Sequence, residues 1–213
     1  MNIWKSAILI ALVLSLVLAV ACGDDDDDNQ GSPYLDDDAD DDADDDDFYD
    51  PAFSCSGEVC TDPAVGLMWQ NEDTDRKTGW NESIDYCHDL DMGDGFGGFH
   101  GWRLPTISEL RSLIRGCPET VTGGECAVAD DCLSWGECWD DSCRSCEVFG
   151  GPGLEGRYWP EGMEGTTTFH WSASETDYPE DENAWHVVFA NGSISRSGKS
   201  GAIDCGTRCV RDL

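Results

Sequence analysis

The side chains that could carry out the largest number of different reactions in this 213-residue sequence are its 12 cysteines. Thiols can form disulfides, bind metal ions or act as nucleophiles, and an oxidising compartment favours disulfides. Cys22 is a separate case, treated below, so 11 cysteines (12 − 1) remain and at least one of them lacks a partner within the chain. The 11 are Cys55, Cys60, Cys87, Cys117, Cys126, Cys132, Cys138, Cys143, Cys146, Cys205 and Cys209.

Six of these cysteines lie within residues 117–146, among Gly, Asp and Ser with little hydrophobic periodicity. A zinc knuckle would use Cys143 and Cys146, but a single C-x-x-C pair is weak support for a metal site. We therefore predict a disulfide-rich insertion over residues 117–160. Cys55 and Cys60, which flank a short turn, are expected to be in disulfides as well.

Carboxylate and amide side chains gather in a second stretch, between Trp171 and Trp185. Calcium binds six to eight oxygens, and a loop can bring that many together. The simpler interpretation is a solvated acidic surface, and composition alone leaves both interpretations open. The candidate ligands are Glu175, Asp177, Glu180, Asp181, Glu182 and Asn183.

Histidine, a frequent acid–base catalyst, occurs four times without a recognisable partner motif. The sequence contains no nucleophile elbow, zinc-protease helix motif or phosphate-binding glycine loop. We therefore predict no catalytic residues and no enzyme activity. The four histidines are His88, His100, His170 and His186.

The elements that must position these residues centre on residues 101–110. Leu104 precedes a proline and is held extended, and Thr106 with Glu109 forms a capping box that starts a helix. This helix is expected to end near Gly116, and Arg103 is expected to pair with a carboxylate. Its apolar stripe, which faces a core, is Ile107, Leu110, Leu113 and Ile114.

The other predicted elements are also short. Asn81 can cap a helix over residues 82–90, and Asn191-Gly192 fits a tight hairpin turn. Strands are predicted at residues 65–70, 168–172, 185–190, 193–197 and 207–211. Two short helices and several short strands indicate an α+β domain.

Residues 1–21 read as a signal segment, because Lys5 is followed by an apolar run that ends at Ala21. Ala19-Val20-Ala21-Cys22 resembles the lipobox of bacterial lipoproteins, which implies cleavage before Cys22 and lipidation of its thiol. An ordinary cleaved signal is the alternative. With lipidation, the chain would be a cell-envelope protein attached to the outer membrane through its lipid.

Residues 22–50 are predicted to be a disordered tether, since 16 of the 27 positions from 24 to 50 are aspartate. Residues 51–213, the head, are long enough for one domain. The net charge of the head is −18 (−33 + 16 − 1), because the 16 aspartates and Lys5 fall outside it. Nucleic acid is excluded as a partner, since it is bound by basic surfaces.

The order of motifs resembles the C-terminal domain of the Lcl family, the Legionella collagen-like adhesin. The likeness covers residues 61–213 apart from the insertion. It is carried by Gly66-Leu67-Met68-Trp69-Gln70, Trp80 to Tyr86-Cys87, Trp102-Arg103-Leu104-Pro105-Thr106, Glu109-Leu110, Trp171-Ser172-Ala173-Ser174, Ala184-Trp185, Phe189, Gly192 and Arg208-Cys209-Val210-Arg211.

This resemblance implies a C-type lectin-like fold with a disulfide between Cys87 and Cys209. It also implies an adhesin-like binding module for a carbohydrate or another surface polymer. By analogy with lectins, calcium would be held between Trp171 and Trp185, and Tyr178 would stack on a sugar ring. A structural envelope protein is one alternative, and a thiol enzyme like the formylglycine-generating enzymes, which share the lectin-like superfamily, is another.

Overall fold

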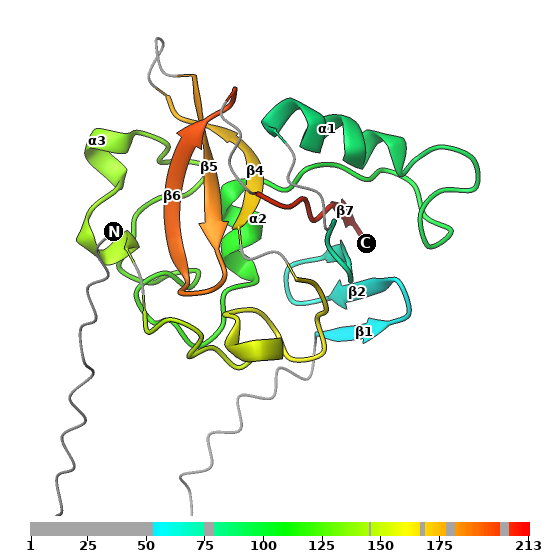
Figure 1. Ribbon diagram of the computed structural model, residues 1–213, viewed down its shortest axis with the longest axis horizontal. Helices are drawn as coiled ribbons and strands as arrows, with labels where there is room; N and C mark the ends of the chain where they lie inside the picture. Colours follow the sequence, from blue (N-terminus) through cyan, green and yellow to red (C-terminus); the bar gives the residue numbers. More distant parts are fainter. Residues whose placement is uncertain (1–52, 75–78, 145, 167–168, 178–181, 201–204) are drawn as a thin grey trace, which may run out of the picture. The chain divides into compact units, whose positions relative to one another are not determined.

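Two antiparallel sheets carry the fold (Figure 1). The computed structural model describes residues 53–74, 79–144, 146–166, 169–177, 182–200 and 205–213. The predicted signal segment and tether, residues 1–50, lie outside these residues. Within the described part of the chain, no helix has the length and apolar character needed to cross a membrane.

The first sheet has the strand order β1-β2-β3-β7. The predicted strand 65–70 begins only at Leu67, because Gly66 adopts a left-handed φ of +70° in the preceding turn. The predicted strand 207–211 is shifted to 210–212, and before it Thr207 O accepts a hydrogen bond from Thr74 N, in the segment after β3. The strands are β1 (Ser54–Ser56), β2 (Val59–Asp62), β3 (Leu67–Gln70) and β7 (Val210–Asp212).

The second sheet is an up-and-down arrangement of β4 (Phe169–Glu175), β5 (Asn183–Val188) and β6 (Ser193–Gly198). The predicted hairpin at Asn191-Gly192 is present, but its loop is longer than two residues, because Val188 pairs with Ser193 and residues 189–192 form the loop. Phe189 explains the longer loop: its side chain is buried, and its carbonyl accepts a hydrogen bond from Tyr158 N at 2.8 Å.

Two helices pack on the second sheet. α1 (Trp80–Asp89) begins two residues earlier than predicted and is capped at Gly79, not Asn81. The capping side chain belongs to the first turn of the helix: Glu82 Oε2 accepts a hydrogen bond from Gly79 N at 3.1 Å. The earlier start places the Trp80 indole within 2.8 Å of Ser172 O on β4.

α2 (Ile107–Ser112) follows the predicted corner and its capping box is confirmed. Thr106 Oγ1 accepts from Glu109 N at 3.2 Å, and the Glu109 carboxylate accepts from Thr106 N at 2.8 Å. The helix ends at Ser112 rather than near Gly116, but its predicted apolar stripe is buried. Arg103 pairs with Glu109, as expected, and also with Asp212.

Residues 117–160 fold into short turns around α3 (Trp135–Cys138), η1 (Asp141–Cys143) and η2 (Leu154–Gly156). Three disulfides, all internal to this insertion, join Cys117 to Cys146, Cys126 to Cys143 and Cys132 to Cys138. The two cysteines of the C-x-x-C pair therefore belong to different bridges.

Two further disulfides lie outside the insertion, between Cys55 and Cys60 and between Cys87 and Cys209. The second is the pairing implied by the resemblance, and it ties α1 to the segment before β7. The five bridges together use ten of the 11 cysteines of the head, and Cys205 is completely buried.

The core is rich in tryptophan. One buried cluster gathers Trp69, Trp159 and Trp185 around α2, and a second gathers Trp102 and Trp171 beside the Cys87–Cys209 disulfide. Few helices, two antiparallel sheets and several disulfides make this a mixed α+β fold, as predicted.

Candidate functional site

The stretch predicted to hold calcium is only partly a loop. β4 extends to Glu175 and β5 begins at Asn183, so these two candidate ligands lie on strands. Glu180 and Asp181, together with the predicted stacking residue Tyr178, lie outside the described residues. The described part of the loop is therefore limited to residues 176, 177 and 182.

Contacts within the protein hold the carboxylate of one candidate ligand and the backbone of another. The Glu175 carboxylate lies 2.5 Å from Lys199 Nζ, and this ammonium lies 5.1 Å from the centre of the Trp80 ring. Asp177 N donates to Leu133 O, which ties the loop to the insertion. Glu175 would thus have to leave Lys199 to bind an ion, and the calcium site stays a prediction.

Among the described residues, one group of three ligand atoms lies close enough to hold an ion, at Cys117, Glu119 and Cys146. The two sulfurs of this group form a disulfide with each other. A metal ion is bound by thiolates, so this group in its oxidised state does not offer a thiolate site.

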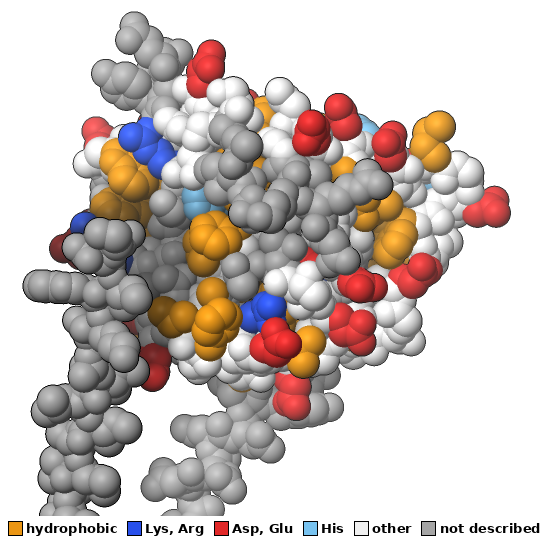
Figure 2. Space-filling model, in the orientation of Figure 1, with side chains coloured by type: hydrophobic (Ala, Val, Ile, Leu, Met, Phe, Trp, Pro, Cys, Tyr) orange, Lys and Arg blue, Asp and Glu red, His pale blue; other side chains and the backbone are white. Residues whose placement is uncertain are grey.

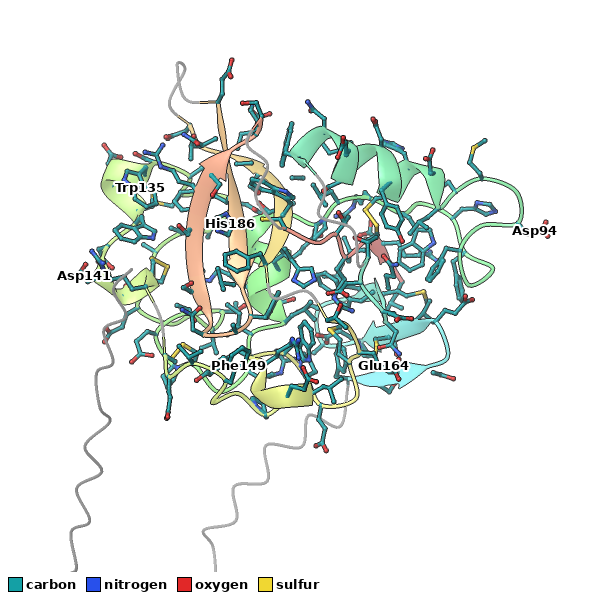
Figure 3. All side chains as sticks on the ribbon, viewed as in Figure 1. Asp94, Trp135, Asp141, Phe149, Glu164 and His186 are labelled. Atoms are coloured by element: carbon teal, nitrogen blue, oxygen red, sulfur yellow. A yellow bond between two sulfur atoms is a disulfide. The ribbon has the colours of Figure 1, made fainter. Side chains whose placement is uncertain are left out.

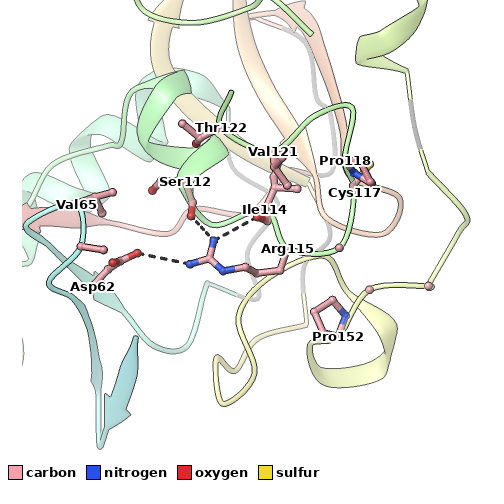
Figure 4. Close-up of a pocket in the computed structure, with 14 residues that line it drawn as sticks. Asp62, Val65, Ser112, Ile114, Arg115, Cys117, Pro118, Val121, Thr122 and Pro152 are labelled. Atoms are coloured by element: carbon pink, nitrogen blue, oxygen red, sulfur yellow. Dashed lines mark hydrogen bonds and ion pairs between the residues drawn. The ribbon is translucent and has the colours of Figure 1, made fainter. Parts of the chain in front are cut away.

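An apolar groove of about 740 Å³ lies between the end of α2, the turn after β2 and the two ends of the insertion (Figure 4). Aliphatic side chains, prolines and glycines line most of it, which is the lining expected of a ligand site of this volume. Its residues are Asp62, Ala64, Val65, Ser112, Ile114, Arg115, Gly116, Cys117, Pro118, Val121, Thr122, Gly150, Gly151 and Pro152.

Two charged side chains line the apolar groove, and each faces the other. Arg115 Nη2 lies 3.8 Å from the buried carboxylate of Asp62. Arg115 Nη1 donates to the carbonyls of Ser112 at 2.5 Å and Ile114 at 3.2 Å. The guanidinium is therefore fixed by the protein, and the inner surface of the groove is close to neutral.

Arg111 positions one wall of the apolar groove. Its guanidinium is buried and donates to Thr120 O at 3.1 Å, Val121 O at 2.8 Å and Val128 O. Burial lowers the pKa of Arg111. Because α2 carries this arginine, the segment around Val121 is held against the same helix that supplies Ser112.

The opposite wall depends on glycine. A Cβ at Gly151 would lie 2.4 Å from Arg157 O, and one at Gly153 would lie 2.3 Å from Trp159 Cδ1. Both approaches are closer than real side chains allow, so this turn packs on the core only as bare backbone. It presents Pro152 to the solvent.

A second hollow, the acidic groove, adjoins the first and shares Pro152 with it. It measures about 560 Å³ and carries three exposed glutamates, Glu72, Glu161 and Glu164. Figure 3 labels Glu164, and on the face drawn in Figure 2 acidic side chains clearly outnumber basic ones. Its other lining residues are Pro152, Gly153, Leu154, Gly162, Met163, Gly165 and Thr166.

A buried charge cluster lies beneath the acidic groove. His170 Nε2 is 2.9 Å from Asp73 Oδ2, and both side chains have no exposed area. Arg208, also fully buried, donates to Gln70 O at 2.7 Å and to the carbonyls of Asn71 and Glu164. Burial lowers the pKa of Arg208 to about 10, against the opposing effect of Asp73.

Within this cluster the carboxylate is stabilised. Burial by itself would raise the pKa of Asp73, but the hydrogen bond from His170 and the charge of Arg208 bring it below its usual value. Burial lowers the pKa of His170, and Asp73 opposes the change. The cluster joins β4, the segment after β3 and the residue before Cys209, so it holds the core together.

The comparison with protein families matches residues 58–211 to the Lcl C-terminal domain. The chain belongs to the Lcl C-terminal domain family. No curated protein matches the chain. No solved structure matches it either. In this Lcl C-terminal domain, the matched range includes the insertion and therefore both walls of the apolar groove.

Sequence reasoning missed both grooves of this Lcl C-terminal domain. Their residues come from separate segments, which for the apolar groove are residues 62–65, 112–122 and 150–152, and no short motif joins such segments. One local signal was present: Gly150-Gly151-Pro152-Gly153 is a turn of the kind that packs tightly and exposes a proline.

Proposed function

We propose that this chain is an envelope-anchored, non-catalytic binding module, related to adhesins, that engages a surface polymer through the apolar groove. The observation that carries the proposal is the groove itself. Its volume of about 740 Å³ and its aliphatic lining are typical of binding sites, and it is held open by Arg111, Arg115 and a glycine turn.

Membership of the Lcl C-terminal domain family supports an adhesin-related role. Carbohydrate is the ligand class implied by the lectin-like resemblance, with calcium between β4 and β5 as the accompanying ion. The lipid on Cys22 and the acidic tether would place the head at a distance from the membrane surface. Together the family membership, the lipid anchor and the acidic tether support a binding module that faces away from the membrane and binds a polymer.

Binding of the purified full-length chain to two arrays, one of glycans and one of surface polypeptides, tests the proposal. Each array is measured with and without calcium. We expect signal on at least one array, reduced at least about tenfold by Val65→Asp, which puts a charge into the apolar groove. Met92→Asp is the matched control, since Met92 is 75% exposed and lies away from the groove lining.

Absence of binding on both arrays would contradict the proposal and would favour the alternative of a structural envelope protein. Signal that is unaffected by Val65→Asp would place the binding site elsewhere on the chain. Turnover of a substrate by the purified chain, lost when a thiol is alkylated, would instead support the alternative of a thiol enzyme.

A further inference from the structure

We infer that the two grooves together take a polypeptide segment that carries both aliphatic and cationic side chains. The inference rests on the proposed function and names the class of polymer that the apolar groove binds. It is carried by the lining of the apolar groove, by its continuity with the acidic groove at Pro152, and by the charge of the head.

The lining of the apolar groove suits aliphatic side chains. Val65 is 48% exposed, and Pro118, Val121 and Pro152 add further aliphatic surface to the lining. Its ion pair is satisfied internally, so a ligand would meet little net charge. No aromatic ring belongs to the described lining of either groove, whereas sugar-binding sites commonly offer a ring face for stacking.

The acidic groove suits lysine or arginine. Glu72, Glu161 and Glu164 line it, and its described lining includes no lysine or arginine. The two cations beneath it are committed to the protein: Arg157 Nη2 donates to Thr166 O at 2.8 Å, and Arg208 Nη2 donates to Glu164 O at 2.5 Å. The three glutamates are therefore available to a positive partner.

An extended polypeptide can satisfy both grooves at once. Its side chains alternate in direction, so aliphatic residues can enter one hollow while neighbouring basic residues reach the other past Pro152. The net charge of −18 on the head (−33 + 16 − 1) would also attract a cationic segment from a distance.

The test uses the full-length chain and a synthetic decapeptide of alternating leucine and lysine. Two matched peptides replace either every leucine by serine or every lysine by glutamate. The 16 aspartates of residues 24–50 will attract any lysine peptide, and the lysine–serine peptide measures that contribution. We expect the leucine–lysine peptide to bind at least about tenfold more tightly than either matched peptide by calorimetry at 150 mM salt, a salt level at which exposed charges are partly screened.

Two variants localise the binding. Val65→Asp and the triple variant Glu72→Gln, Glu161→Gln, Glu164→Gln should each weaken the leucine–lysine peptide about tenfold. A matched triple variant at exposed carboxylates outside both grooves, Glu125→Gln, Asp131→Asn, Glu137→Gln, changes the net charge equally and should have little effect.

Three results would overturn the inference: equal binding of the leucine–lysine and lysine–serine peptides, equal effects of the two triple variants, or no effect of Val65→Asp on peptide affinity. Array signal from glycans alone, lost in Val65→Asp, would also overturn it while leaving the proposed function intact. Absence of binding on both arrays would instead contradict the proposed function itself.

Discussion

Glu109 accepts two hydrogen bonds from Arg103, at 2.7 Å each, and the same carboxylate closes the first turn of α2 at Thr106 N. One side chain thus fixes both the direction in which the chain arrives and the start of the helix. Arg103 also bonds through its backbone to Val210 on β7, so this pair joins the helix to the first sheet.

Loss of this carboxylate should destabilise the fold. Glu109→Gln removes the charge that pairs with Arg103 but keeps an oxygen that accepts from Thr106 N, and we expect the free energy of unfolding to fall by about 1 kcal/mol. Urea unfolding followed by tryptophan fluorescence measures the change. Glu125→Gln, at an exposed position outside these contacts, should stay within about 0.5 kcal/mol of the parent chain. Equal values for the two variants would show that the Arg103 contact adds nothing.

The disulfide between Cys87 and Cys209 closes a loop with a sequence separation of 122, whereas Cys132–Cys138 has a separation of 6. In the chain-entropy model, removal of the long bridge costs about 4–5 kcal/mol and removal of the short one about 2 kcal/mol. Alanine pairs at each bridge, compared by urea unfolding, should follow this order. The reverse order would mean that folded-state contacts at the bridges outweigh the loop entropy.

Stability should depend on pH through His186, which is buried against Phe169 and Trp171. Burial lowers the pKa of His186 to about 4. The unfolded chain takes up this proton below about pH 6.5 while the folded chain does not, so stability falls as the pH drops from about 6.5 to about 4. The loss from this residue alone is about 3 kcal/mol.

His186→Phe should remove that part of the pH dependence. Urea unfolding of the parent chain and the variant, from pH 7.5 to pH 4.5, gives the difference. His88→Gln, at an exposed histidine, should keep the slope of the parent chain. A slope unchanged in His186→Phe would mean that other groups cause the acid sensitivity.

The local chemistry of the sequence was enough to predict the corner at residues 101–110. Thr106 and Glu109 cap each other over three residues, and such a device is complete within its own segment. The start of α1 was missed for a related reason: the helix is capped by Glu82 acting on the backbone of Gly79, so the capping position needs no polar side chain.

Long-range relationships were harder to predict. The hairpin after β5 was assigned to Asn191-Gly192, but Phe189 is drawn into the core and bonds to Tyr158 of the insertion. The Cys87–Cys209 pairing came from the resemblance, since spacing alone allows many pairings. The grooves depend on how separate segments meet, which hydrophobic periodicity does not specify.

The predicted lipidation at Cys22 can be tested in cells that process lipoproteins. A Cys22→Ala chain should stay unprocessed and take up no fatty acid, because the thiol is the acceptor. Mass spectrometry of the N-terminal peptide, with the parent chain alongside, measures both effects. Normal cleavage and release of Cys22→Ala would indicate an ordinary signal segment.

The predicted calcium site can be tested by calorimetry on the full-length chain. The 16 aspartates of residues 24–50 are present in both chains when the parent chain is compared with Asp181→Ala, Glu182→Ala, so any binding by them cancels. We expect the variant to lose one calcium per chain, since an ion of this size needs six to eight oxygens and the variant removes two carboxylates. Identical titrations would leave this stretch as a plain acidic surface.

The insertion leaves the domain and returns to it at one point, where Arg115 N donates to Tyr158 O at 3.1 Å. Seven of the residues that line the apolar groove belong to the segment 117–160, and seven belong to the rest of the head. A shortened chain that joined residue 115 to residue 158 could keep Asp62, Val65 and Ser112 but would have nothing opposite them. The insertion therefore supplies one wall of the apolar groove and the rest of the head supplies the other, so removal of residues 116–157 would abolish the groove as a two-walled site.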